Sequence, residues 1–146
     1  MDTQITSKMK INKPVSEVYE AIANPEKMAN YWFSSGTARI EQGRTITWKY
    51  AEYNAEGDIY VLEADGNSKI VFSWGAKGEE TTVTILLEQM DDTATVINIS
   101  ESGFKKDDPD LFQKMLGQKE GWVYVLSCLK AYLENGIHTL RASLVH

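Results

Sequence analysis

The segment from about residue 108 to residue 135 predicts one long helix with a broad apolar face, and this helix constrains the fold more than any other feature. Acidic residues and Pro109 stand where a helix N-terminus favours them, and Gly136 can end the helix in the left-handed conformation. No other segment matches its length, so the rest of the chain must cover its apolar face. That face falls within one arc at about 100° per residue and comprises Leu111, Met115, Trp122, Val125, Leu126, Leu129 and Leu133.

The rest of the chain predicts short strands joined by tight turns, interrupted once by helices. Residues 3–11 alternate as a half-buried strand, and two short helices are expected next, one after Pro14 and one from Pro25 to about Asn30. Consecutive short strands favour an antiparallel sheet, which we expect to bend around the final helix in an α+β fold. Six more strands are expected, at residues 37–42, 44–50, 55–63, 69–74, 83–87 and 95–99.

Two details of this sheet follow from local patterns. Gly43 alone separates residues 37–42 from residues 44–50, which predicts a tight hairpin. Both faces of residues 55–63 are apolar, with Ile59 and Val61 on one and Tyr60 and Leu62 on the other, so the pattern leaves the orientation of this strand open.

Composition indicates one domain over residues 1–136 and a tail over residues 137–146, where the helical pattern is lost. The net charge of −6, from 21 acidic against 15 basic residues, argues against nucleic acid or an anionic membrane as the partner. The single cysteine, Cys128, excludes an intramolecular disulfide. The first ten residues lack the apolar run of a signal peptide, and no apolar run approaches the ~18 residues of a membrane span. We therefore expect a cytoplasmic protein.

Several local motifs occur in an order that resembles a known family. They are Pro14 to Tyr19 leading to Pro25-Glu26 and Tyr31-Trp32, then Gly57 at a strand start, residues 70–74, residues 101–104, and Gly121-Trp122 followed by Leu126, Leu129 and Leu133. Together they resemble the helix-grip fold of the START/Bet v 1-like superfamily, and within it the family named after the C-terminal domain of the activator of Hsp90 ATPase. The resemblance covers about residues 3–136.

The resemblance implies a curved antiparallel sheet of six or seven strands that grips the long helix, with an apolar cavity between them. It does not imply one activity, because this superfamily includes lipid and plant-hormone binders, aromatic-polyketide cyclases and co-chaperone domains.

The sequence offers no catalytic residue, metal site or cofactor motif. The two histidines, His138 and His146, lie in the tail without a close partner at ligand spacing, and Cys128 is interpreted as a small buried hydrophobe. The paired acids at residues 79–80 and 91–92 fall in turns, where solvated charge explains them. We expect no catalytic residue, no metal and no cofactor.

The candidate site is an internal cavity with aromatic walls. Such aromatic residues also pack ordinary cores, but a sheet bent around a helix encloses more volume than a flat sandwich, which favours a pocket. The predicted lining comprises Trp48, Tyr50, Phe72, Trp74 and Ile85 from the strands and Gln118, Trp122, Val125, Leu126 and Leu129 from the helix.

One polar residue and one aromatic triplet have two interpretations each. Gln118 falls at the centre of the apolar arc, so it either points into the cavity and orients a ligand or water, or is exposed because Gly117 breaks the helix. Residues Tyr31, Trp32 and Phe33 form either a rim at the cavity mouth or a plug that closes one end of the core.

Three functions are considered, the first from these patterns and the resemblance together and the other two as what the resemblance implies. The first is binding of a small hydrophobic molecule, lipid-like or an aromatic polyketide or flavonoid, by a monomer or weak homodimer. The second is a co-chaperone-type module that binds a protein partner and regulates an ATPase. The third is a polyketide cyclase or dehydratase, whose acid–base groups would be Tyr50, Glu63, Glu88 or Tyr132.

Overall fold

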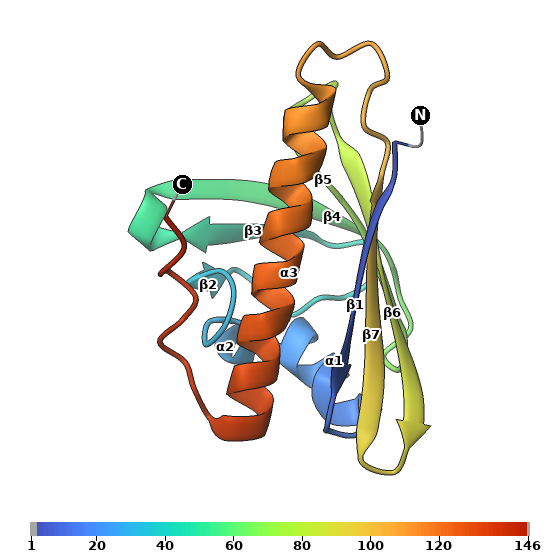
Figure 1. Ribbon diagram of the computed structural model, residues 1–146, viewed down its shortest axis with the longest axis vertical. Helices are drawn as coiled ribbons and strands as arrows, with labels where there is room; N and C mark the ends of the chain where they lie inside the picture. The colour runs from blue at the N-terminus through green and yellow to red at the C-terminus, as the bar shows by residue number, and fades with distance from the viewer. Residues whose placement is uncertain (1–2, 146) are drawn as a thin grey trace.

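A computed structural model describes residues 3–145. Its seven strands form one antiparallel sheet in the order β1-β7-β6-β5-β4-β3-β2, and the long helix lies across the concave face of that sheet (Figure 1). The helices are α1 (Val15–Ala23), α2 (Pro25–Met28) and α3 (Leu111–Asn135), and a 3₁₀ turn covers Ala51–Tyr53. The strands are β1 (Ile5–Ile11), β2 (Ser35–Gly36), β3 (Thr45–Tyr50), β4 (Ala55–Ala64), β5 (Lys69–Trp74), β6 (Thr81–Asp91) and β7 (Ala94–Ser102). The expected α+β helix-grip architecture is confirmed.

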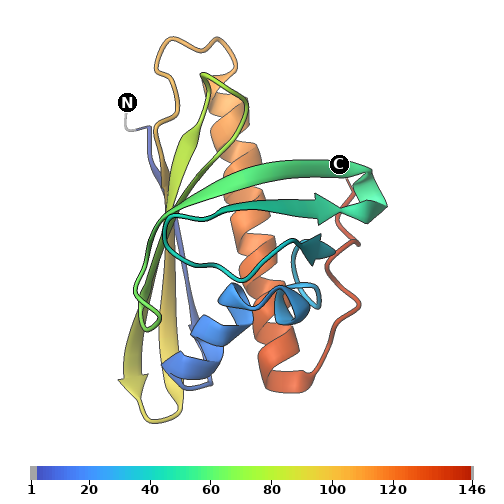
Figure 2. The same ribbon diagram turned by 180° about the vertical axis from the view of Figure 1, so that it is seen from behind.

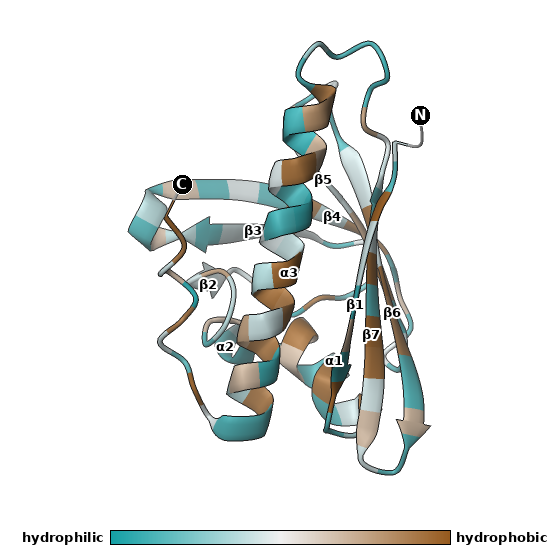
Figure 3. Cartoon of the chain, in the orientation of Figure 1, coloured by the Kyte–Doolittle hydropathy of each residue, from teal (hydrophilic) through white to brown (hydrophobic). Residues whose placement is uncertain are grey.

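The apolar face of α3 is buried against the sheet, as its periodicity predicts. Trp122, Leu126 and Leu129 are buried, and α3 packs most closely along β1. The view from behind shows β3 and β4 bending away from the other strands, so that the sheet wraps around the helix (Figure 2). Hydrophobic residues recur along α3, while the loop that precedes it is mostly hydrophilic (Figure 3). The helix and the sheet therefore enclose a shared core.

The helix begins three residues later than expected, and Gly117 does not interrupt it. Asp108 accepts a hydrogen bond from the backbone N–H of Asp110 at 2.8 Å and pairs with Lys114, so the acidic residues form a turn before the first helical residue. Gly136 ends the helix with φ of +67°, in the left-handed region that glycine adopts most readily.

The predicted strand at residues 37–42 is wrong. In this part of the chain the strand that pairs with β3 is limited to Ser35–Gly36, and residues 37–42 form a loop. The reason is a competing contact: Ile40 is buried, and its backbone N–H donates to the carbonyl of Ala23 at 3.0 Å. The segment therefore packs on the end of α1 instead of extending the sheet.

The orientation of β4 depends on its neighbours. Ile59 and Val61 face the core and are almost fully buried, whereas Tyr60 and Leu62 lie on the convex face with 46% of their surface exposed. Ile59 pairs with Ile46 of β3 on one side and with Trp74 of β5 on the other, and both partners also face inward. The pairing register with β3 and β5 therefore determines which face of β4 is buried, and the residue pattern of β4 alone does not.

The short helices close the lower end of the core in Figure 1, and the second is shorter than expected. The buried Tyr31, just after α2, donates from its hydroxyl to the carbonyl of Ala21 at 2.8 Å and stacks on Tyr132 of α3 at 6.0 Å. Within residues 3–145, no helix combines the length and apolar character needed to cross a bilayer.

Candidate functional site

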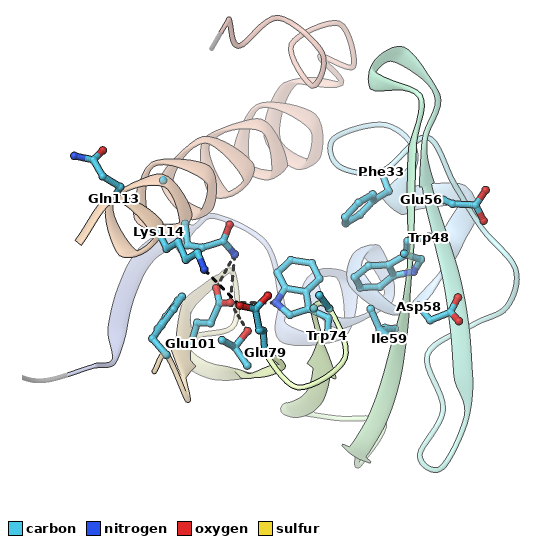
Figure 4. Close-up of a pocket in the computed structure, with 17 residues that line it drawn as sticks. Phe33, Trp48, Glu56, Asp58, Ile59, Trp74, Glu79, Glu101, Gln113 and Lys114 are labelled. Atoms are coloured by element: carbon cyan, nitrogen blue, oxygen red, sulfur yellow. Dashed lines mark hydrogen bonds and ion pairs between the residues drawn. The ribbon is translucent and has the colours of Figure 1, made fainter. Parts of the chain in front are cut away.

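A groove of about 770 Å³ opens between α3 and the strands β3, β4 and β5. Its wall is part aromatic and part polar, which is the usual make-up of a small-molecule site. Figure 4 shows the residues that line the groove. The lining residues are Phe33, Trp48, Glu56, Gly57, Asp58, Ile59, Trp74, Gly75, Ala76, Glu79, Thr81, Glu101, Phe104, Gln113, Lys114, Gly117 and Gln118.

Three rings form the apolar wall. Phe33, Trp48 and Trp74 point toward one another in Figure 4, with ring centroids 5.0 to 6.4 Å apart. In the same view the carboxylates of Glu56 and Asp58 turn away from the rings, so only the backbone of that stretch faces the groove. The wall that a ligand meets on β3 and β4 is therefore apolar.

Gly57 keeps this wall open. It pairs with Trp48 across β3 and β4, and a Cβ atom built on Gly57 would meet no atom within 4 Å. A glycine inside a strand often marks a place where another molecule approaches the backbone. Here it leaves free space directly beside an aromatic ring.

The polar end of the groove is organised by Glu101, which is only 1% exposed. Its Oε1 accepts from the Trp122 indole at 2.8 Å and from Gln118 Nε2 at 3.0 Å. Its Oε2 accepts from the Thr81 hydroxyl at 2.6 Å and from the Trp74 indole at 3.1 Å. Four donors from β5, β6 and α3 thus converge on one carboxylate of β7.

The donors compensate for the burial of a carboxylate that has no cationic partner among residues 3–145. Charge-assisted hydrogen bonds of this kind are roughly twice as strong as neutral ones. Both indoles donate only, so they suit an ionised acceptor. The network also fixes the Gln118 amide, because Nε2 must face the carboxylate and Oε1 is turned elsewhere. Within the described chain, no hydrogen bond occupies that Oε1 atom.

All four tryptophans of the chain belong to one cluster beside the groove. Trp32 lies at its centre, with ring centroids 4.8 Å from Trp48, 5.4 Å from Trp122 and 6.3 Å from Trp74. Trp74 and Trp122 stack at 5.5 Å. Tryptophan fluorescence of this protein therefore reports on the groove and its immediate surroundings.

A second cavity, of about 240 Å³, lies beyond the groove. It shares only Trp74 and Gln118 with the groove, and the segment 137–145 contributes two residues to its wall. The remaining lining residues are Trp32, Tyr50, Tyr53, Gly121, Trp122, Tyr124, Val125, Arg141 and Leu144.

Arg141 fastens this C-terminal segment to the domain. Its side chain is only 9% exposed and donates to the Trp32 carbonyl at 2.7 Å. It also forms two hydrogen bonds with the Glu52 carboxylate and lies 4.8 Å from the centroid of the Tyr50 ring. The Tyr50 hydroxyl donates in turn to the Arg141 carbonyl, and burial raises the pKa of Tyr50 to about 12. The segment from residue 137 to residue 145 is thus tied to the domain.

The structure brings some of the predicted lining residues together and leaves others in the core. Trp48, Trp74, Gln118 and Phe33 line the groove, and Tyr50, Trp122, Val125 and Trp32 line the second cavity. Five residues line neither cavity and are packed in the hydrophobic core, namely Tyr31, Phe72, Ile85, Leu126 and Leu129. Burial also raises the pKa of the Cys128 thiol, as it does for a cysteine that packs in a core.

The suggested acid–base groups do not gather in the groove. Glu63 pairs with Lys69 at 3.2 Å, Glu88 is exposed on β6, and Tyr132 stacks on Tyr31. The buried acid that does line the groove, Glu101, was not predicted. The alternation of Thr95, Ile97 and Ile99 contains the signal, since the next residue on that inward face is Glu101.

Comparison with known proteins agrees with this fold. The family model described as activator of Hsp90 ATPase homolog 1-like protein matches residues 12–134. The crystal structure of the protein SSP2350 from Staphylococcus saprophyticus is 44% identical, with a TM-score of 0.81 over 92% of this chain and 94% of that one. No curated protein matches the sequence.

Two more distant structures share the fold. The Aha1 dimer from Colwellia psychrerythraea is 18% identical, with a TM-score of 0.78 over 91% of this chain and 97% of that one. BexL, a di-domain ARO/CYC protein from the BE-7585A biosynthetic pathway, is 15% identical, with a TM-score of 0.78 over 90% of this chain and 46% of BexL.

Proposed function

The chain belongs to the activator of Hsp90 ATPase homolog 1-like family, and on that premise we propose that it binds a small, largely apolar molecule in the groove between α3 and the sheet. The observation that carries the proposal is the groove itself, with Phe33, Trp48 and Trp74 along one wall and free space at Gly57. A filled core would have no such opening. The ligand class is aromatic or lipid-like.

Gln118 orients that molecule in this proposal. Glu101 holds Nε2 of the amide, which leaves Oε1 as an acceptor beside the groove. A hydroxyl or amine on the ligand would donate to it. Gln118→Leu should then weaken binding of 4-n-butylphenol by about fivefold, the equivalent of a ~1 kcal/mol hydrogen bond, and leave binding of n-butylbenzene unchanged. Unchanged affinity for the phenol together with a gain in stability would refute this role.

The test of the overall function is a titration of tryptophan fluorescence with flavonoids, sterols and fatty acids. Because all four tryptophans cluster at the groove, an occupied groove must change the emission. N-acetyltryptophanamide under the same conditions corrects for absorption by the ligands. Unchanged tryptophan emission with every ligand of the library would contradict the proposal.

The family description favours a second candidate, a module that binds a chaperone ATPase. The exposed apolar residues Phe112 and Leu116 on α3 would suit such a contact, since their side chains are 61% and 49% exposed. Capture of a purified Hsp90-type ATPase by the wild type, lost in Phe112→Ser, would support this candidate, and no capture would count against it.

The fold of BexL, which is described as an ARO/CYC protein, raises the third candidate, a cyclase. The groove has one buried acid for such chemistry, Glu101, but both of its oxygens already accept two hydrogen bonds. We therefore assign Glu101 a positioning role. Turnover of a bound polyketide-like ligand that Glu101→Gln abolishes without altering its affinity would reverse this assignment.

A further inference from the structure

Two residues separate the groove from the second cavity. Trp74 comes from β5 on the sheet side and Gln118 from α3 on the opposite side, and these are the two residues that line both spaces. A group that holds both side chains in place therefore limits how far a molecule in the groove can extend.

Glu101 fixes both of them. Its carboxylate accepts from Trp74 Nε1 at 3.1 Å and from Gln118 Nε2 at 3.0 Å, so one buried group holds the two halves of the partition. The ring of Trp74 is also stacked on Trp122, at a centroid distance of 5.5 Å. Neither side chain can turn aside without breaking hydrogen bonds in a buried site, which is costly.

The C-terminal segment forms part of the wall of the second cavity. Arg141 and Leu144, in the segment 137–145, line the second cavity, and Arg141 is tied to Glu52 and to the Trp32 carbonyl. The second cavity is a smaller space next to the groove, of about 240 Å³ against about 770 Å³.

We propose that Trp74 and Gln118, held by Glu101, form a partition that sets the maximum length of the ligand. This inference rests on the proposed function and deepens it, because it assigns the residues that determine ligand size. A molecule shorter than the groove gains affinity with each added methylene, and a molecule that reaches the partition gains none.

The test is a series of n-alkylbenzenes, which carry no hydroxyl to bond to Gln118, from propyl to nonyl, titrated by isothermal calorimetry. For the wild type we expect affinity to rise by up to about fourfold per methylene, the factor that ~0.8 kcal/mol corresponds to, and then to level off. Gln118→Ala removes half of the partition, and its affinities should continue to rise for chains longer than the wild-type limit. Trp74→Phe thins the other half and should shift the limit in the same direction, so the test does not depend on one variant folding.

Gln113→Ala is the matched control. Gln113 also lies on α3 and lines the groove, but not the second cavity, so its removal should leave the limiting chain length unchanged. If both partition variants level off at the wild-type length, the inference is wrong and the proposed function still stands. If the wild type binds no member of the series while flavonoids or sterols also leave its fluorescence unchanged, both are wrong.

Discussion

The indole Nε1 of Trp122 lies 2.8 Å from Oε1 of Glu101, and this hydrogen bond joins α3 to β7 inside the core. Both side chains are almost fully buried. Three further donors share the same carboxylate, so helix position, groove shape and the orientation of the polar end depend on one residue.

Glu101→Gln should destabilise the fold even though the side chain keeps its shape. The amide has one acceptor oxygen, so its NH₂ group would face the indole of Trp74 or that of Trp122, and an indole can only donate. We expect a loss of about 1–3 kcal/mol in the free energy of unfolding, which is the usual cost of one unsatisfied buried donor. Urea denaturation measures it.

The control for that change is Glu63→Gln. Glu63 lies in the same sheet but forms a half-exposed pair with Lys69. Its replacement should alter stability by no more than about 0.5 kcal/mol. Equal losses in the two variants would mean that the hydrogen bonds of Glu101 add nothing to stability.

Gly57→Leu should block the groove without disturbing the fold. A Cβ at this position meets open space, and leucine suits a strand at least as well as glycine does. We expect unchanged stability within about 1 kcal/mol and loss of the fluorescence response to every ligand that the wild type binds. Glu56→Leu, whose side chain turns away from the groove, is the control and should bind normally. Normal binding by Gly57→Leu would contradict the location of the site.

Arg141→Gln should release the C-terminal segment. The variant loses the two hydrogen bonds to Glu52 and the ring contact with Tyr50. We expect stability to fall by roughly 1–2 kcal/mol and acrylamide to quench the tryptophans more strongly, because the segment covers the cavity beside Trp32 and Trp122. Arg44→Gln, which removes only an exposed pair with Glu41, should leave quenching unchanged. Equal quenching in the two variants would show that the segment shields nothing.

Asp65 should give stability a pH dependence in acid. Its carboxylate accepts from the backbone N–H groups of Asn67, Ser68 and Lys69 in the turn between β4 and β5. These bonds, that from Ser68 foremost, lower the pKa of Asp65 from 3.8 to about 2. A lowered folded-state pKa stabilises the protein above pH 3.8, and this stabilisation is lost as the pH falls toward 2.

Asp65→Asn should therefore be less stable than the wild type at pH 7, and the difference should shrink as the pH falls below about 4. Urea denaturation at pH 7, 5, 4 and 3 measures the difference, with Asp107→Asn in the exposed loop before α3 as the control. A difference that is constant from pH 7 to pH 3 would contradict the role of the ionised turn.

The fold could be predicted from the sequence because its signals are local. The apolar arc of α3, the alternation of β1 and β5 and the stop at Gly136 each depend on residues within one element. The prediction was wrong at residues 37–42, where a long-range contact decides the structure. The backbone N–H of Ile40 donates to the carbonyl of Ala23 at the end of α1, and the strand-like pattern of the segment does not indicate this contact.

The site was harder to predict for the same reason. Which of the inward-facing aromatic residues line a cavity and which fill the core depends on how far the sheet bends, so Phe72 and Trp74 look alike in sequence and differ in the structure. Arg141 lies in a segment without any pattern, and its partners are distant in the chain. Glu101 was not predicted either, although the alternation of β7 turns it inward and could have identified it.

The most direct test of the central claim is a titration followed by ¹H–¹⁵N spectra of the indole N–H groups, which give one signal for each of the four tryptophans. With a ligand found by fluorescence, the account predicts the largest shifts at Trp48 and Trp74, which line the groove, and smaller ones at Trp32. Amide signals of Tyr60 and Leu62 on the convex face should not move. Shifts confined to the convex face, with the indole signals unchanged at saturation, would contradict ligand binding in the groove.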